Sequence, residues 1–147
     1  EGLAAAAANT GFMGRWQVIA TEPYTVCDTG HNAVGIRFVA SQLEALETDR
    51  IFAVMGFAKE KDLDKIMPLL PKKIHYIFTK ASIDRARKIE DIAAAADTLG
   101  LDYECQPSVT AAVTRARCLA QPTDTIFIGG SNFVVAEVDA IVNLVME

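Results

Sequence analysis

The feature that most constrains this chain is the alternation of short β-rich apolar runs with longer stretches of helical spacing. Residues 51–55 form a continuous apolar run, which is typical of a strand buried on both faces. In residues 32–47, by contrast, apolar side chains recur at the spacing of one helix face. The alternation repeats about five times, and it predicts a mostly parallel sheet covered by helices.

The expected elements follow from this pattern and from the turn signals between them. We expect strands over residues 17–20, 24–27, 51–55, 74–79, 102–105 and 125–128, and helices over 32–47, 62–70, 83–99, 108–120 and 132–146. The pair Glu22-Pro23 is a turn signal that predicts a hairpin between the first two strands. The helix over residues 62–70 is expected to end near Pro68, and Gly100 is expected to end the helix over 83–99. Ser108 is a candidate N-cap for the helix over 108–120.

The predicted fold class is therefore a three-layer, Rossmann-like α/β domain. Its sheet has about six strands and is mostly parallel, with one antiparallel edge strand contributed by the initial hairpin. Helices are expected on both faces of this sheet.

Length, charge and cysteine usage narrow the class of protein. The chain has 147 residues, which suits one domain. With 14 Lys and Arg against 19 Asp and Glu, the net charge is −5, which argues against nucleic acid as a partner. No apolar run reaches about 18 residues, so we expect no membrane partner. The 3 cysteines include no Cys-x-x-Cys pair, which predicts free thiols in the cytoplasm and no structural zinc site.

Polar residues follow several strands at their carboxyl ends, where open α/β sheets bind ligands. Asp28 ends a strand and precedes a glycine and a helix start, so its carboxylate can accept ribose hydroxyls. His31 and Asn32 are expected at the helix N-terminus, where backbone N–H groups favour an anion. The alternative is that Asp28 caps a turn and Asn32 is an N-cap.

A second polar turn follows the last strand. Gly129 and Gly130 let the backbone approach a ligand closely, and Ser131 offers a hydroxyl suited to a carboxylate or phosphate. The alternative is a tight strand-to-helix turn with Ser131 or Asn132 as its N-cap. The cluster at residues 59–62 is interpreted as a solvated helix start.

Common catalytic and phosphate-binding motifs are missing from the sequence. Gly30 and Gly35 have the glycine spacing of a P-loop, but Ile36 and Arg37 stand where Lys and Ser/Thr are required. No Gly-x-Gly-x-x-Gly is present, and no Gly-x-Ser-x-Gly elbow surrounds Ser131. We therefore expect that this chain does not cradle a triphosphate by itself. Arg15 remains open as a phosphate clamp or as a surface residue beside Trp16.

Four segments in order resemble one family. Residues 9–19 resemble the segment that opens the C-terminal domain of folylpolyglutamate synthase and dihydrofolate synthase, which are relatives of the Mur peptide ligases. Residues 28–32 resemble that family's Asp-Gly-Ala-His-Asn-Pro signature. Residues 54–62 resemble its next strand and Asp-Lys-Asp loop, and residues 128–133 resemble its final Gly-Ser-x-(Phe/Tyr) turn.

The resemblance covers residues 9–144, with departures in one loop. Gly30 stands where the family has Ala, Thr29 where it has Gly, and Ala33 where it has Pro. The lost proline removes a favoured first helical residue but no functional group.

The resemblance implies ATP-dependent amide formation with glutamate through an acyl phosphate. It implies ATP contacts for Asn9, Arg15 and Asp28, glutamate contacts for His31 and Ser131, and catalytic roles for Arg15 and His31. In this family ATP and Mg²⁺ serve the full-length enzyme, so no metal or cofactor is expected on this domain alone. The implied substrates are glutamate and dihydropteroate or folates.

The same resemblance implies a particular domain organisation. We expect residues 1–8 to be the tail of an upstream linker or helix, and residues 9–147 to be the C-terminal domain of a ligase. Its partner would be an N-terminal ATPase domain of the same chain. The alternative is a non-catalytic, flavodoxin-like or receiver-like binding module, or a structural domain. A receiver needs clustered acidic residues at strand ends, and only Asp28 is so placed.

Overall fold

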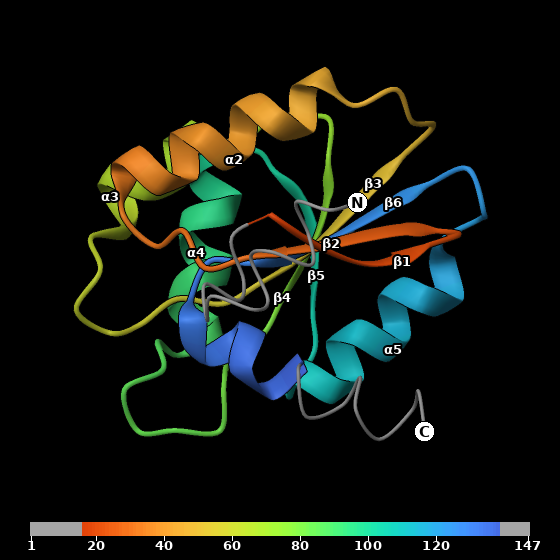
Figure 1. The fold of residues 1–147 in the computed structure, drawn as a ribbon. Coiled ribbons are helices and arrows are strands. Elements are labelled where there is room, and N and C mark those ends of the chain that lie inside the picture. Colours follow the sequence, from red (N-terminus) through yellow and green to blue (C-terminus); the bar gives the residue numbers. More distant parts are fainter. Residues whose placement is uncertain (1–15, 139–147) are drawn as a thin grey trace.

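The computed structural model describes residues 16–138, and within them lies a six-stranded sheet in the order β1-β2-β6-β3-β4-β5 (Figure 1). β1 pairs with β2 in antiparallel fashion, and the other pairs are parallel. The strands are β1 (Gln17–Thr21), β2 (Tyr24–Asp28), β3 (Ile51–Met55), β4 (His75–Phe78), β5 (Asp102–Cys105) and β6 (Thr125–Gly129). The predicted hairpin and fold class are confirmed.

Helices cover both faces of the sheet (Figure 1). They are α2 (Ala33–Ala45), α3 (Leu63–Ile66), the 3-10 turn η1 (Met67–Leu69), α4 (Ile89–Leu99) and α5 (Val109–Leu119), followed by a helical segment over residues 132–138. α2, α3, η1 and α4 pack on one face, whereas α5 and residues 132–138 pack on the other.

The central strands carry the core because both of their faces are buried. Every residue of β3 and β6 is buried, as a continuous apolar run predicts. Side chains alternate between the two faces, so Ala53 and Met55 join the core under α2. Phe52 and Val54 join the second core, under α5.

Side-chain and glycine caps end the helices at several of the predicted residues. Asn32 precedes α2, and its side-chain oxygen accepts a hydrogen bond from the backbone N–H of Gly35 at 2.8 Å. Ser108 caps α5 in the same way, accepting from the N–H of Ala111 at 3.1 Å. Gly100 ends α4 in the left-handed conformation, with φ of 72°.

Two expected helices differ from the observed ones. The helix expected over residues 83–99 begins only at Ile89, because residues 85–87 pair instead with the loop after β3. This pairing includes an isolated antiparallel bridge between Ala58 and Ala86. The helix expected over residues 62–70 is split into α3 and η1, where Pro68 lacks the N–H that an α-helix needs.

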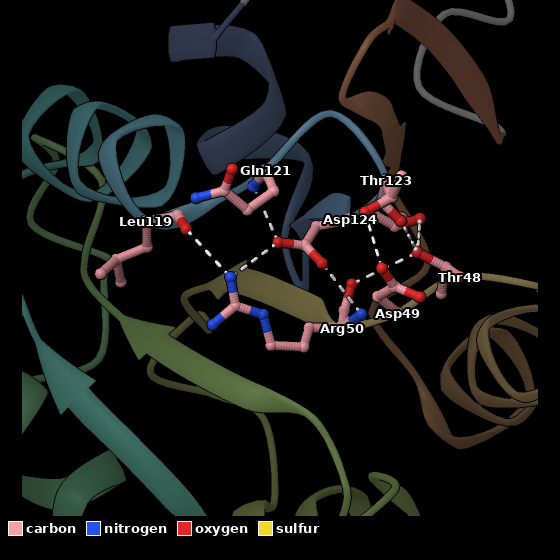
Figure 2. Close-up of polar contacts among 8 residues, drawn as sticks. Thr48, Asp49, Arg50, Leu119, Gln121, Thr123 and Asp124 are labelled. Atoms are coloured by element: carbon pink, nitrogen blue, oxygen red, sulfur yellow. Dashed lines mark hydrogen bonds and ion pairs between the residues drawn. The ribbon is translucent and has the colours of Figure 1, made fainter.

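At the amino-terminal edge of the parallel strands, the buried carboxylate of Asp124 holds two loops together (Figure 2). Asp124 is 2% exposed and accepts hydrogen bonds from the backbone N–H groups of Gln121 and Arg50, at 2.7 and 3.1 Å. The Arg50 guanidinium also donates to Asp124 at 2.9 Å. The loop before β6 is thereby fixed to the loop before β3.

Among residues 16–138, no helix has the length and apolar character needed to span a membrane.

Candidate functional site

A pocket of about 230 Å³ opens at the carboxyl ends of β2, β3 and β6. The loops after these strands and the loop after β4 line it. Its polar side chains are His31, Glu60, Lys61, Arg85, Ser131 and Asn132. The strand ends lie level, since Gly129 pairs with both Asp28 and Met55.

The topology explains why a pocket forms at this edge. β6 leads into residues 132–138 on one face of the sheet, whereas its neighbours β2 and β3 lead into helices on the other face. Adjacent strands whose connections diverge in this way leave a crevice at their carboxyl ends, which is the usual ligand position in open α/β sheets.

Gly130 forms part of the pocket lining and needs to be glycine. Its φ is 90°, in the region that favours residues without a Cβ. A Cβ placed there would lie 2.6 Å from the carbonyl oxygen of Gly56. The missing side chain therefore lets the turn after β6 pass directly beside the end of β3, which the hydrogen bond from Gly56 N–H to Gly129 O also links at 3.3 Å.

Ser131 begins the helical segment and lines the pocket. It is 4% exposed, and its hydroxyl accepts a hydrogen bond from the backbone N–H of Phe133 at 3.0 Å. This contact is the one that an N-cap residue makes, so Ser131 is the N-cap that the sequence offered as an alternative. A hydroxyl has one donor and two acceptor positions, so this bond leaves its O–H able to donate to a ligand.

Asp28 lies at the end of β2 and is 1% exposed. One carboxylate oxygen accepts from the N–H of Gly30 at 2.7 Å, and the other accepts from the N–H of Trp16 at 2.8 Å. Trp16 has φ of 47°, an unusual value for a non-glycine residue, and its ring lies 6.3 Å from that of Phe127. Asp28 therefore fixes both its own turn and the backbone that enters β1.

The structure brings two of the predicted site residues together. His31, which is exposed in the turn before α2, and Ser131, which follows β6, line the same pocket. Asp28 lies at the same edge of the sheet, paired with Gly129. Asn9 and Arg15 lie outside the described residues.

Arg85 lines the pocket although no sequence motif predicts it as a site residue. Arg85 forms an ion pair with Glu60 at 3.1 Å, and its guanidinium lies 5.5 Å from the centre of the Phe133 ring. The backbone N–H of Glu60 itself donates to its carboxylate, and together with the guanidinium of Arg85 it holds the pKa of Glu60 below its usual value. A charged cluster in a loop was the available signal for Glu60 and Lys61, but Arg85 sits in a stretch with helical spacing.

No group of three or more His, Cys, Asp and Glu side chains in residues 16–138 is placed to hold a metal ion. Two of the free cysteines, Cys105 and Cys118, are exposed, and Cys27 is buried.

Together, the fold and the pocket define an α/β domain that presents a small polar site at the switch point of a parallel sheet. A protein-family model described as "Mur ligase, glutamate ligase domain" matches residues 14–132. The chain belongs to this family.

Two curated relatives are named as folylpolyglutamate synthases with a second activity. A probable bifunctional folylpolyglutamate synthase/dihydropteroate synthase of Haloferax volcanii is 34% identical over 130 residues, which is 88% of this chain and 16% of the relative. A dihydrofolate synthase/folylpolyglutamate synthase of Buchnera aphidicola is 32% identical over 134 residues, which is 88% of this chain and 31% of the relative. The chain thus spans less than a third of either relative.

Solved structures share the fold. FolC of E. coli, in complex with DHPP and ADP, has a TM-score of 0.81 at 24% identity, covering 91% of this chain and 32% of that one. A bifunctional folylpolyglutamate synthase/dihydrofolate synthase with Mn, AMPPNP and L-glutamate bound also has a TM-score of 0.81, at 22% identity, covering 89% of this chain and 32% of that one.

Proposed function

We propose that this chain is the C-terminal domain of an ATP-dependent ligase that adds L-glutamate to dihydropteroate, to folates or to both. The observation that carries the proposal is the match of residues 14–132 to a glutamate ligase domain. The names of the two curated relatives support the folate substrates. The share of each relative that this chain spans supports a further domain in the parent protein.

The proposed reaction has two steps. A carboxylate of the pteroate or folyl substrate takes the γ-phosphoryl group of ATP and releases ADP, and the amine of glutamate then attacks the acyl phosphate and loses a proton. The tetrahedral intermediate expels phosphate and leaves an amide. Arg15 would stabilise the charge that develops on the transferred phosphoryl group, and Asn9 would contact ATP.

His31 and Ser131 are proposed to hold the incoming glutamate. Both line the pocket at the carboxyl ends of the strands, and the Ser131 hydroxyl retains a donor for a carboxylate. The proposed catalytic role of His31 is to place the glutamate amine against the acyl phosphate. Proximity of this kind accounts for a large part of the rate of two-substrate reactions.

Asp28 has two proposed roles, which are to contact ATP and to orient the neighbouring loops. Its two bonds to backbone N–H groups support the second role. The bond from Trp16 also fixes the first described residue before β1.

Mg²⁺ would serve the parent enzyme by neutralising charge on the ATP phosphates. We place its ligands, and the P-loop, in the N-terminal ATPase domain. The isolated chain is accordingly proposed to have no ligase activity, and the parent protein is proposed to act in the cytoplasm.

The test is to assay the full-length parent protein with ATP, glutamate and either dihydropteroate or tetrahydrofolate. We expect glutamate addition to at least one of them. Arg15→Ala should lower kcat strongly, whereas Ser131→Ala should mainly raise KM for glutamate. Unchanged kinetics in both variants would remove the site assignment, and glutamate addition by the isolated chain would contradict its proposed inactivity.

A further inference from the structure

The loop between β4 and α4, residues 79–88, contributes Arg85 to the pocket and is held in place by backbone contacts. The N–H of Lys59 donates to the carbonyl of Arg85, and the N–H of Arg87 donates to the carbonyl of Phe57, both at 2.7 Å. At its other end, the N–H of Ser82 donates to the carboxylate of Glu137 at 2.5 Å. Hydrogen bonds therefore hold residues 79–88 to the loop after β3 and to the helical segment over residues 132–138. The backbone that carries Arg85 is fixed as a result.

The Arg85 side chain reaches the part of the pocket that holds Ser131. Its guanidinium lies over the ring of Phe133, and the N–H of Phe133 is bonded to the Ser131 hydroxyl. The ring therefore links the guanidinium to the residue proposed to contact glutamate. Stacking on an aromatic face also limits the directions in which a guanidinium can point.

Stability alone does not explain this arginine. Its ion pair with Glu60 is exposed, with 66% of the Arg85 side chain and 52% of the Glu60 side chain accessible to solvent. Exposed ion pairs contribute little to folding. The pair engages one nitrogen of a group that has five N–H donors, so donors remain for a second carboxylate.

The charge of the pocket also favours an anion. Arg85 and Lys61 contribute two basic side chains to the lining and Glu60 contributes one acidic side chain, so basic side chains outnumber the acidic one. Of the two cations, Arg85 has the planar fork that matches both oxygens of a carboxylate.

We propose that Arg85 is a specificity-determining residue that binds one of the two carboxylates of the incoming amino acid. This inference rests on the proposed function, since it assigns a residue to the glutamate site of that ligase. Ser131 and His31 would take the other carboxylate. Selection of a dicarboxylic amino acid over its amides would then follow, because an amide at this position leaves the guanidinium without its anion.

The test uses the full-length parent protein at saturating ATP and folate substrate. Arg85→Gln should raise KM for glutamate about tenfold or more, with kcat and KM for ATP changed by less than about twofold. Arg117→Gln, at an exposed position on α5 away from the pocket, is the matched control and should leave KM for glutamate unchanged.

Two amide analogues of glutamate identify which of its two carboxylates Arg85 binds. The wild-type enzyme should use both glutamine, which lacks the side-chain carboxylate, and isoglutamine, which lacks the α-carboxylate, less well than glutamate. Arg85→Gln should lose most of its preference for glutamate over one of them. An active Arg85→Gln enzyme with unchanged KM for glutamate and unchanged discrimination against both amides would overturn the inference.

A second variant separates recognition from folding. If Arg85→Gln lowers the melting temperature, Arg85→Lys carries the test, because it keeps the charge and loses the fork. It should show an intermediate rise in KM for glutamate, and an unchanged KM would overturn the inference. A wild-type parent protein that adds no glutamate would instead remove the proposed function, and this inference with it.

Discussion

At the scale of single residues, the pocket depends on positions where backbone segments pass very close to one another. Gly130 and Gly56 are such a pair, and Gly30 and Gly35 are another, since a Cβ on Gly35 would lie 2.9 Å from the Cα of Gly30. Asp28 fixes the remaining turn by accepting two backbone N–H groups. These contacts set the shape of the site before any ligand arrives.

Replacing Gly130 tests this dependence. Gly130→Ala should destabilise the fold by about 2–4 kcal/mol, because strain at positive φ adds to a clash with the Gly56 carbonyl. Urea unfolding would measure the change. Gly100→Ala is the matched control, since Gly100 also has positive φ but has no atom within 4 Å of its Cβ position. It should cost only about 1 kcal/mol, and equal losses at the two sites would show that close approach is unimportant.

At the scale of elements, β4 and β5 are linked by contacts between His75 and two acidic side chains, Asp102 and Glu104. When the ring of His75 is protonated, its Nδ1 donates to Asp102 at 3.0 Å and its Nε2 donates to Glu104 at 2.8 Å. Arg115 of α5 donates to the same Glu104 at 2.9 Å. Burial lowers the pKa of His75, but hydrogen bonds to Glu104 and Asp102 outweigh burial and raise it.

This arrangement predicts a pH dependence of stability. The contribution of His75 should be fully present below about pH 6.5, the pKa of an unfolded histidine, and should be lost as the pH rises through its raised folded value. Unfolding free energies measured between pH 5 and 9 should therefore show a decline that His75→Gln removes. A variant with the same decline as the wild type would assign the pH dependence to other groups.

The opposite pH behaviour is expected at the loop before β6. Burial raises the pKa of Asp124, but hydrogen bonds from the N–H of Gln121 and from Arg50 outweigh it and lower the pKa below its usual value. Its contribution should be present above the pKa of an unfolded carboxyl and lost as the pH falls through the lower folded value.

Substitution of Asp124 tests the same contacts at neutral pH. Asp124→Asn should cost about 1–3 kcal/mol, since one side-chain oxygen replaces two and Arg50 loses its anion. The exposed Asp64, at the start of α3, gives Asp64→Asn as a control of near-zero effect. Equal stability of the two variants in urea unfolding would contradict a locking role for Asp124.

Prediction from sequence succeeded where local pattern and tertiary structure agree. The buried strand at 51–55, the caps at Asn32 and Ser108 and the end of α4 at Gly100 all depend on nearby residues. The start of α4 was predicted six residues too early, because residues 85–87 pair with a loop nearly 30 residues earlier in the chain. Helical spacing carries no information about such a partner.

Only part of the candidate site could be predicted from the sequence, because local pattern places some of its residues and not others. His31 and Ser131 follow strands, so the rule for parallel sheets placed them at one edge. Arg85 lines the pocket because its neighbour Ala86 pairs with Ala58 in the loop after β3. No sequence periodicity reveals this pairing.

At the scale of the whole molecule, the chain is a folded ligase domain that spans less than a third of its curated relatives. Its pocket at the carboxyl ends of β2, β3 and β6 is lined by polar side chains that include His31, Arg85 and Ser131. We propose that this domain forms one side of a two-domain active site, in which the other domain activates a carboxylate and this one delivers the amine.

The most direct test is the stoichiometry of ADP release and glutamate incorporation by the full-length parent protein. The account predicts that ADP forms in step with radiolabelled glutamate entering the folate product, at one ADP for each glutamate, and that Ser131→Ala reduces both together at limiting glutamate. ADP formation with no incorporation of glutamate, under conditions where glutamate and folate substrates are saturating, would contradict it.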